Sequence, residues 1–123
     1  MHNVRTSVTL EDAITAYKDI FLAGRNLAPR TQKEYLTDLG QLCAYLTTVA
    51  GVSSVQAVTR THLEGFLAFL DQQQLTGSTR RRKVAAIRSF FFFLEDAGHR
   101  VGNPAAKLIP PEREWNQPRY LTE

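Results

Sequence analysis

The chain has 123 residues and a mass of 13.9 kDa, which fits one domain, and its 43% of hydrophobic residues is enough to bury a core. A net charge of +3 and a pI near 9.3 are modest for a nucleic-acid binder, so only the placement of charge can support such a function. One cysteine and three scattered histidines exclude an internal disulfide and form no recognised metal-ligand spacing, so no metal or cofactor is expected. Without a leader or an apolar run long enough to span a bilayer, we expect a cytoplasmic or nucleoid-associated protein.

The first eight residues are expected to be flexible, and a helix is predicted to follow them. Thr9 can cap this helix, with Asp12 at the third helical position, and Gly24 is expected to end it in a left-handed conformation. The apolar face predicted for it consists of Leu10, Ala13, Ile14, Tyr17, Ile20 and Phe21.

A second helix is predicted from Pro29 to Val49, because proline lacks an N–H that would have no partner at the first helical position. Cys43 lies beside the core face, which favours a structural thiol over a nucleophile. The core face is predicted at Tyr35, Leu39, Leu42 and Leu46, with Leu36 alongside, while Arg30, Gln32, Lys33 and Gln41 face away.

Residues 51–58 are poor in periodicity and indicate a connection. Thr61 is then predicted to cap a third helix that ends near Gln74 and buries Leu63, Phe66, Leu67 and Leu70. A turn and cap at 76–78 predict a fourth helix, which Gly98 ends and which buries Val84, Ile87, Phe91 and Leu94, supported by Phe90.

This pattern predicts an all-α bundle of four to five helices over residues 9–108. Asn103 and Pro104 start another turn, and the three prolines between Ile109 and Arg119 indicate an extended linker, so residues 109–123 are assigned to a linker.

Positive charge is concentrated on the fourth helix, since no acidic residue lies between Asp71 and Glu95. Helical geometry places Arg81, Ala85, Arg88 and Phe92 on one stripe and Arg82, Ala86 and Ser89 on the next, both predicted to face away from the core. Arginine can grip phosphates or guanine, and small residues let a DNA backbone approach. The pattern alone fits a solvated basic helix equally well.

The run from Phe90 to Phe93 spans most of a helical turn, so not all four rings can point into one core. Phe92 and Phe93 are predicted to be left over, with at least one exposed as a contact for another protein. The alternative is that a fifth helix or the linker covers them.

No catalytic arrangement is recognisable in the sequence. The carboxylates lie at helix starts or on exposed faces, and no serine or cysteine has a histidine at a triad spacing. The chain by itself is therefore not expected to be an enzyme.

The ordered series LAPRTQKEYLTDLGQLCAYL, THLEGFLAFL, GSTRRRKVAAIRSFFFFLEDAG, NPAAKLIPP and QPRYLTE resembles the core-binding domain of tyrosine recombinases, the Xer-type and phage integrase family. The resemblance covers Thr9 to Glu123. It implies a SAM-like fold whose second and fourth helices meet adjacent major-groove faces of double-stranded DNA. A catalytic domain, which is absent from this chain and would begin at Leu121, would clamp the other side of the duplex.

The resemblance places the catalytic residues in that absent domain, so no tyrosine here is given the nucleophile's role. Its own catalytic domain and neighbouring protomers are the implied protein partners. Two positions depart from the family pattern: Ala28 replaces a common serine or threonine cap, and Phe92 replaces a polar residue. The implied DNA-binding residues are Arg30, Thr31, Gln32, Lys33, Ser78, Thr79, Arg80, Arg81, Arg82, Lys83 and Arg88.

Two rival functions stay open from the sequence. One is a helical protein-interaction module in which the basic patch is incidental. The other is a free-standing regulator or excisionase-like accessory protein, which would need no linker ending in Leu121-Thr122-Glu123.

Overall fold

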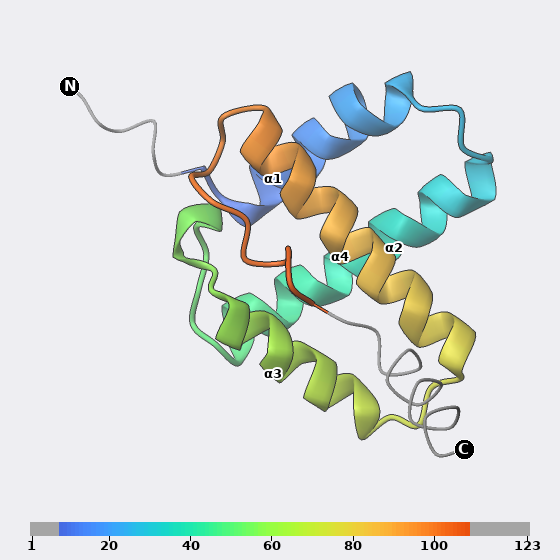
Figure 1. Ribbon diagram of the computed structural model, residues 1–123, viewed down its shortest axis with the longest axis vertical. Coiled ribbons are helices and arrows are strands. Elements are labelled where there is room, and N and C mark those ends of the chain that lie inside the picture. The colour runs from blue at the N-terminus through green and yellow to red at the C-terminus, as the bar shows by residue number, and fades with distance from the viewer. Residues whose placement is uncertain (1–7, 109–123) are drawn as a thin grey trace, which may run out of the picture.

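The computed structural model describes residues 8–108, and within them the chain forms four α-helices and no β-strand (Figure 1). The helices are α1 (Leu10–Ala16), α2 (Pro29–Thr48), α3 (Arg60–Asp71) and α4 (Gly77–Asp96). The packing between α2 and α4 is the most extensive. The predicted all-α class is confirmed, whereas the linker assigned to 109–123 and most of the flexible start lie outside the described residues.

The first predicted helix is not regular along its length. Thr9 caps α1, its Oγ1 accepting from Asp12 N at 3.0 Å, but after Ala16 the chain widens into a π-helical turn, Tyr17–Phe21, and then tightens into a 3₁₀ turn, Leu22–Gly24. Because the wide turn shifts the phase of the helix, Ile20 is 65% exposed and Leu22 is buried. The core assignment of Ile20 was therefore wrong.

Three predicted helix boundaries also need correction. Gly24 does not adopt a positive φ, and the segment ends instead where Arg25 becomes extended. The cap of α3 is Thr59 and not Thr61, which lies inside the first turn: Thr59 Oγ1 accepts from His62 N, and His62 Nδ1 accepts from Thr59 N at 3.0 Å. The helix ends at Asp71, three residues before the predicted end.

The ends of α4 agree with the prediction. Thr76 caps its start by accepting from Thr79 N, and Gly98 follows its end with a φ of 82°. His99 N donates to Leu94 O and Gly98 N donates to Glu95 O, the two hydrogen bonds of a Schellman motif. Residues 104–107 form turns, and no fifth helix follows α4 within the described chain.

The predicted core faces of α3 and α4 are buried throughout, as are Leu39, Leu42 and Leu46 of α2, while Tyr35 and Cys43 are only half-buried. Phe93 corrects the sequence analysis, because it is 4% exposed and its ring lies 5.8 Å from Tyr17 and 5.6 Å from Phe21. The π-helical turn therefore covers a second side of α4, and of the two predicted leftover rings only Phe92, 51% exposed, faces solvent.

Candidate nucleic-acid interface

A buried carboxylate joins the two helices that carry the predicted DNA-binding residues. Asp38 of α2 is 1% exposed and accepts from Arg82 Nε and Nη2, each at 2.9 Å, and from Lys83 Nζ at 2.8 Å. Lys83 also donates to Gln41 Oε1 at 2.5 Å. Two cations of α4 thus neutralise and orient one carboxylate of α2, which fixes the relative position of the two helices.

Arg80 is also turned inward. It is 9% exposed, its Nε lies 2.6 Å from Asp71 Oδ1, and its Nη2 donates to the carbonyl oxygen of Leu67. Its Nη1 is buried without a hydrogen-bond partner. Arg80 therefore ties the start of α4 to the end of α3. Arg80 and Lys83, two of the DNA-binding residues implied by the resemblance, are thus both turned into the protein.

The predicted second stripe of α4 also faces inward. Ala86 is fully buried, and Ser89 shares a hydrogen bond of 2.8 Å with the hydroxyl of Tyr17. Burial raises the pKa of the Tyr17 hydroxyl above its ordinary value, and this hydrogen bond opposes the shift. Tyr17 lies in the π-helical turn, which packs against α4, so Ser89 faces that turn.

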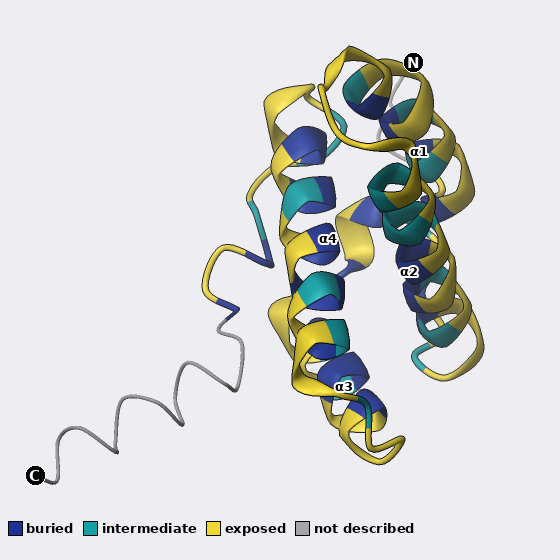
Figure 2. Ribbon diagram, turned by 90° about the vertical axis from the view of Figure 1, so that its right-hand side faces the viewer, coloured by how far each residue is buried: buried dark blue, intermediate teal, exposed yellow. Residues whose placement is uncertain are grey.

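The first stripe of α4 does face solvent. Ser78, Arg81, Ala85, Arg88 and Phe92 are all exposed, and Figure 2 shows the exposed side of α4 running along the helix, away from α2. Arg88 Nη1 donates to the carbonyl oxygen of Leu108 at 3.2 Å, which places the end of the described chain beside this surface. Helical spacing alone was enough to predict this stripe.

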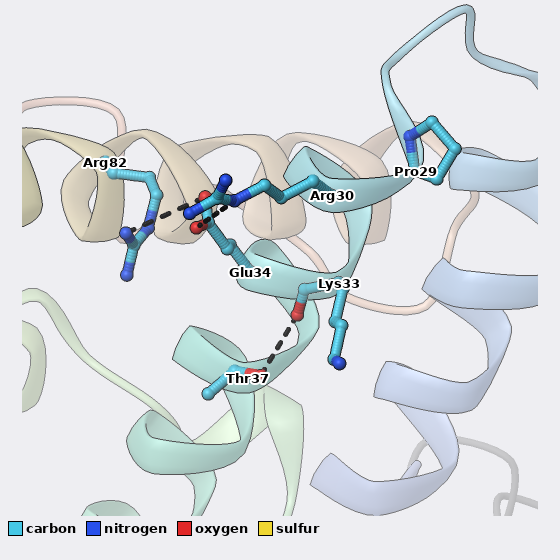
Figure 3. Close-up of a pocket in the computed structure, with 6 residues that line it drawn as sticks. All are labelled: Pro29, Arg30, Lys33, Glu34, Thr37 and Arg82. Carbon is cyan, nitrogen blue, oxygen red and sulfur yellow. Dashed lines mark hydrogen bonds and ion pairs between the residues drawn. The ribbon is translucent and has the colours of Figure 1, made fainter.

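The start of α2 borders a hollow of about 550 Å³, which Arg82 of α4 closes on the other side (Figure 3). Arg30 and Lys33 are exposed, and Thr31 and Gln32 are half-buried. Gln32 Nε2 donates to the carbonyl oxygen of Leu27 and thereby supports a helix start whose Ala28 gives no side-chain cap. We call the hollow lined by Pro29, Arg30, Lys33, Glu34, Thr37 and Arg82 the basic hollow.

Arg82 connects the basic hollow with the interior. Its side chain is 30% exposed, its Nε and Nη2 bind Asp38, and its Nη1 lies 3.8 Å from Glu34 Oε1. The hydrogen bonds to Asp38 raise the pKa of the Arg82 guanidinium, and burial opposes this. The guanidinium therefore stays charged and is held so that Nη1 points toward the hollow.

Asp38 and Glu34 are the residues that sequence reasoning missed. Asp38 follows Tyr35 by three residues and precedes Leu42 by four, so the core face runs through it. Lys83 and Arg80 occupy the equivalent positions before Ile87, at separations of four and seven residues. Charged residues at core positions of two helices were the available signal for a buried ion cluster.

The described residues contain no helix long and apolar enough to cross a membrane, and no group of side chains suited to a metal ion.

Comparison with known proteins identifies the family. Residues 14–98 match the model of the phage integrase N-terminal SAM-like domain. The chain belongs to this family. The four helices thus form the SAM-like fold that the sequence resemblance implied.

The relatives of this SAM-like domain are tyrosine recombinases. The chain is 30% identical to tyrosine recombinase XerC of Roseiflexus sp. (strain RS-1) over 92% of its own length and 36% of the relative's. It is 35% identical to the XerC of Pelobacter propionicus, over 91% of this chain and 37% of the relative. It is 32% identical to the XerC of Oceanobacillus iheyensis, over 91% of this chain and 36% of the relative. The chain thus spans about a third of the relatives it matches. No solved structure matches it.

Proposed function

We propose that this SAM-like domain binds double-stranded DNA through α2 and α4 and contributes target recognition to a site-specific tyrosine recombinase. The observation that carries the proposal is the exposed stripe of α4, where Arg81 and Arg88 flank the small residue Ala85. Arginine forks bind phosphates and guanine edges, and a small side chain between them lets a DNA backbone come close. The basic hollow adds Arg30 and Lys33 at the start of α2.

The contact set differs from the one implied by sequence. The proposed contacts keep nine of the implied residues, and Arg82 contributes its Nη1 through the basic hollow. The other eight are Arg30, Thr31, Gln32, Lys33, Ser78, Thr79, Arg81 and Arg88. Arg80 and Lys83 act from inside by holding α4 against α3 and α2.

An amide NMR titration of the chain with a random-sequence duplex tests the proposal, first at low and then at near-physiological salt. Because phosphate contacts dominate affinity for such a duplex, the shifts should cluster on 30–33 and on the exposed positions of 78–88 and weaken as salt rises. An unchanged spectrum at low salt would overturn the proposal.

Charge reversal gives a second test with a matched control. Replacing Arg81 and Arg88 with Glu should weaken DNA binding by roughly tenfold per charge. Replacing Lys18 and Arg60, which are exposed on other helical segments, changes the net charge equally and should have a much smaller effect. Equal losses in the two double variants would show that bulk charge, and not the α4 surface, governs binding.

The wider assignment rests on the relatives. They are tyrosine recombinases, so we propose that residues 109–123 lead to a catalytic domain that carries the strand-exchange chemistry and the other half of a DNA clamp. Loss of one half of a clamp lowers effective concentration, so binding by the chain alone is expected to be micromolar or weaker, on the order of 1 µM or above at physiological salt.

A second role is favoured by the exposure of Phe92. Its ring lies on the same stripe as Arg88 and is half exposed, which suits contact with the catalytic domain or a neighbouring protomer. If Phe92→Ser abolishes self-association in sedimentation velocity while Arg81→Glu leaves DNA retention unchanged, the protein-interaction function replaces the DNA-binding one.

A further inference from the structure

Glu34 lies within the basic hollow. Its Oε2 is 3.4 Å from Arg30 Nε, and its Oε1 is 3.8 Å from Arg82 Nη1, so one carboxylate faces two guanidinium groups from different helices. Figure 3 shows Arg30 and Arg82 approaching Glu34 from opposite sides. Lys33 supplies the third cation of the hollow. Glu34 is thus the acidic residue among the six that line it.

Neither contact of Glu34 is a tight ion pair. Charge-assisted hydrogen bonds of arginine are usually about 2.7–2.9 Å long, and the same kind of pair on α3, Arg60 with Glu64, has a distance of 2.9 Å. The Arg30 side chain is also 88% exposed, so solvent screens its interaction with Glu34. Glu34 therefore binds its two arginines weakly and gives them up at little cost.

Arg82 does not depend on Glu34 for its orientation. The buried carboxylate of Asp38 accepts hydrogen bonds from Arg82 Nε and Nη2. The ammonium group of Lys83 donates to the same carboxylate and balances its charge. Arg82 Nη1 consequently keeps its direction toward the hollow whether or not Glu34 is in place. The hollow presents a pre-positioned donor to any anion that enters it.

We infer that Glu34 occupies the place of a DNA phosphate in the free protein and competes with that phosphate for Arg30 and Arg82. A phosphate accepts from guanidinium groups with the same fork geometry as a carboxylate, so it can replace Glu34 at both arginines. The inference rests on the proposed function, because it takes the hollow to face the duplex.

The consequence concerns the overall affinity for DNA. Displaced Glu34 stays close to the bound phosphate and repels it, so it lowers the affinity for every duplex regardless of sequence. Because this penalty is the same for every sequence, it leaves the ratio of affinities for two duplexes unchanged. Glu34 thus limits the phosphate-driven part of binding and reads no base.

The test measures dissociation constants of the 123-residue chain for a labelled random-sequence duplex at low salt. Glu34→Gln should bind roughly five- to tenfold more tightly than the natural chain. Glu64→Gln is the matched control, because it removes the same charge from the same type of i,i+4 pair on α3, whose start lies across the molecule from the start of α2 (Figure 1). The control should change affinity by less than about twofold.

A double-mutant cycle separates competition from bulk charge. If Glu34 competes for Arg30, the gain from Glu34→Gln should shrink when Arg30 is also replaced by Gln, whereas a bulk-charge effect would be additive. Thermal unfolding of each variant checks that the fold is kept.

The outcomes are distinct. Equal gains for Glu34→Gln and Glu64→Gln, or weaker binding by Glu34→Gln, would overturn the inference while leaving DNA binding intact. A natural chain that fails to bind the duplex at low salt would overturn the proposed function itself, and the inference with it.

Discussion

The ammonium group of Lys83 lies 2.8 Å from Asp38 Oδ1, and both side chains are buried between α2 and α4. A charge in such a position is stable only while its partner remains, since removing one partner leaves the other uncompensated in the interior. The pair therefore makes the packing of α2 on α4 dependent on a single carboxylate.

Asp38→Asn should lower the free energy of unfolding by about 3 kcal/mol, because Lys83 would stay buried without a counter-ion. Urea unfolding measures this directly. Glu64→Gln breaks only an exposed pair and should cost about 0.5 kcal/mol or less. A cost for Asp38→Asn as small as that of the control would contradict the role assigned to the cluster.

Phe92 and Phe93 give a matched pair of neighbouring rings. Phe93→Ala should cost about 3–5 kcal/mol, since its buried ring packs against Tyr17 and Phe21, whereas Phe92→Ala should cost about 1 kcal/mol or less. Chemical denaturation of both variants checks the difference. Similar costs would mean that the widened turn does not cover α4.

The start of α3 can be tested with two threonines. Thr59→Ala removes the hydroxyl that accepts from His62 N and should destabilise the protein by about 1 kcal/mol. Thr61→Ala lies inside the first turn and should leave thermal stability nearly unchanged. The reverse order of the two midpoints would restore Thr61 as the cap.

Stability should fall in alkaline solution because burial raises the pKa of Tyr17. The folded chain then holds this proton more tightly than the unfolded chain. The stabilisation that the Tyr17 proton gives the folded state is complete below the pKa of tyrosine in the unfolded chain, about 10. It is lost as the pH rises through the higher pKa of Tyr17 in the folded chain. Burial also raises the pKa of the Cys43 thiol, which adds to the loss with the same sign.

Tyr17→Phe removes the tyrosine part of this effect. The variant should lose about 1 kcal/mol near neutral pH with the hydrogen bond to Ser89, and its stability should then decline less steeply than that of the natural chain between about pH 9 and 11. Urea unfolding across that range makes the comparison. Parallel pH profiles would show that Tyr17 titrates alike in both states.

Much of this architecture could be predicted locally. The core faces of α3 and α4 follow from helical spacing. Pro29 and Gly98 mark helix ends by their backbone chemistry, and Thr76 does so with its side-chain hydroxyl. These core faces and helix ends depend on residues within about one helical turn of one another. They can therefore be predicted from the local sequence alone.

The burial of the other residues depends on which helices pack against each other. Phe93 is buried because the segment around Tyr17 packs on a second side of α4, and no pattern within α4 specifies that neighbour. The burial of Lys83 could not be predicted from its neighbours, because its buried partner Asp38 lies 45 residues earlier. Interactions with other helices thus make three cations of the basic run, those at 80, 82 and 83, partners of carboxylates.

The π-helical turn at Tyr17–Phe21 also bears on how the chain tolerates changes in length. Buried Tyr17 and buried Leu22 are five residues apart, whereas a regular α-helical turn takes 3.6. Losing one residue between them would leave four, which a regular helix accommodates with both side chains still inward. The same deletion within α2, α3 or α4 would rotate every later core residue by about 100° and break the packing. The first helical segment is therefore the place where this fold can absorb a one-residue deletion.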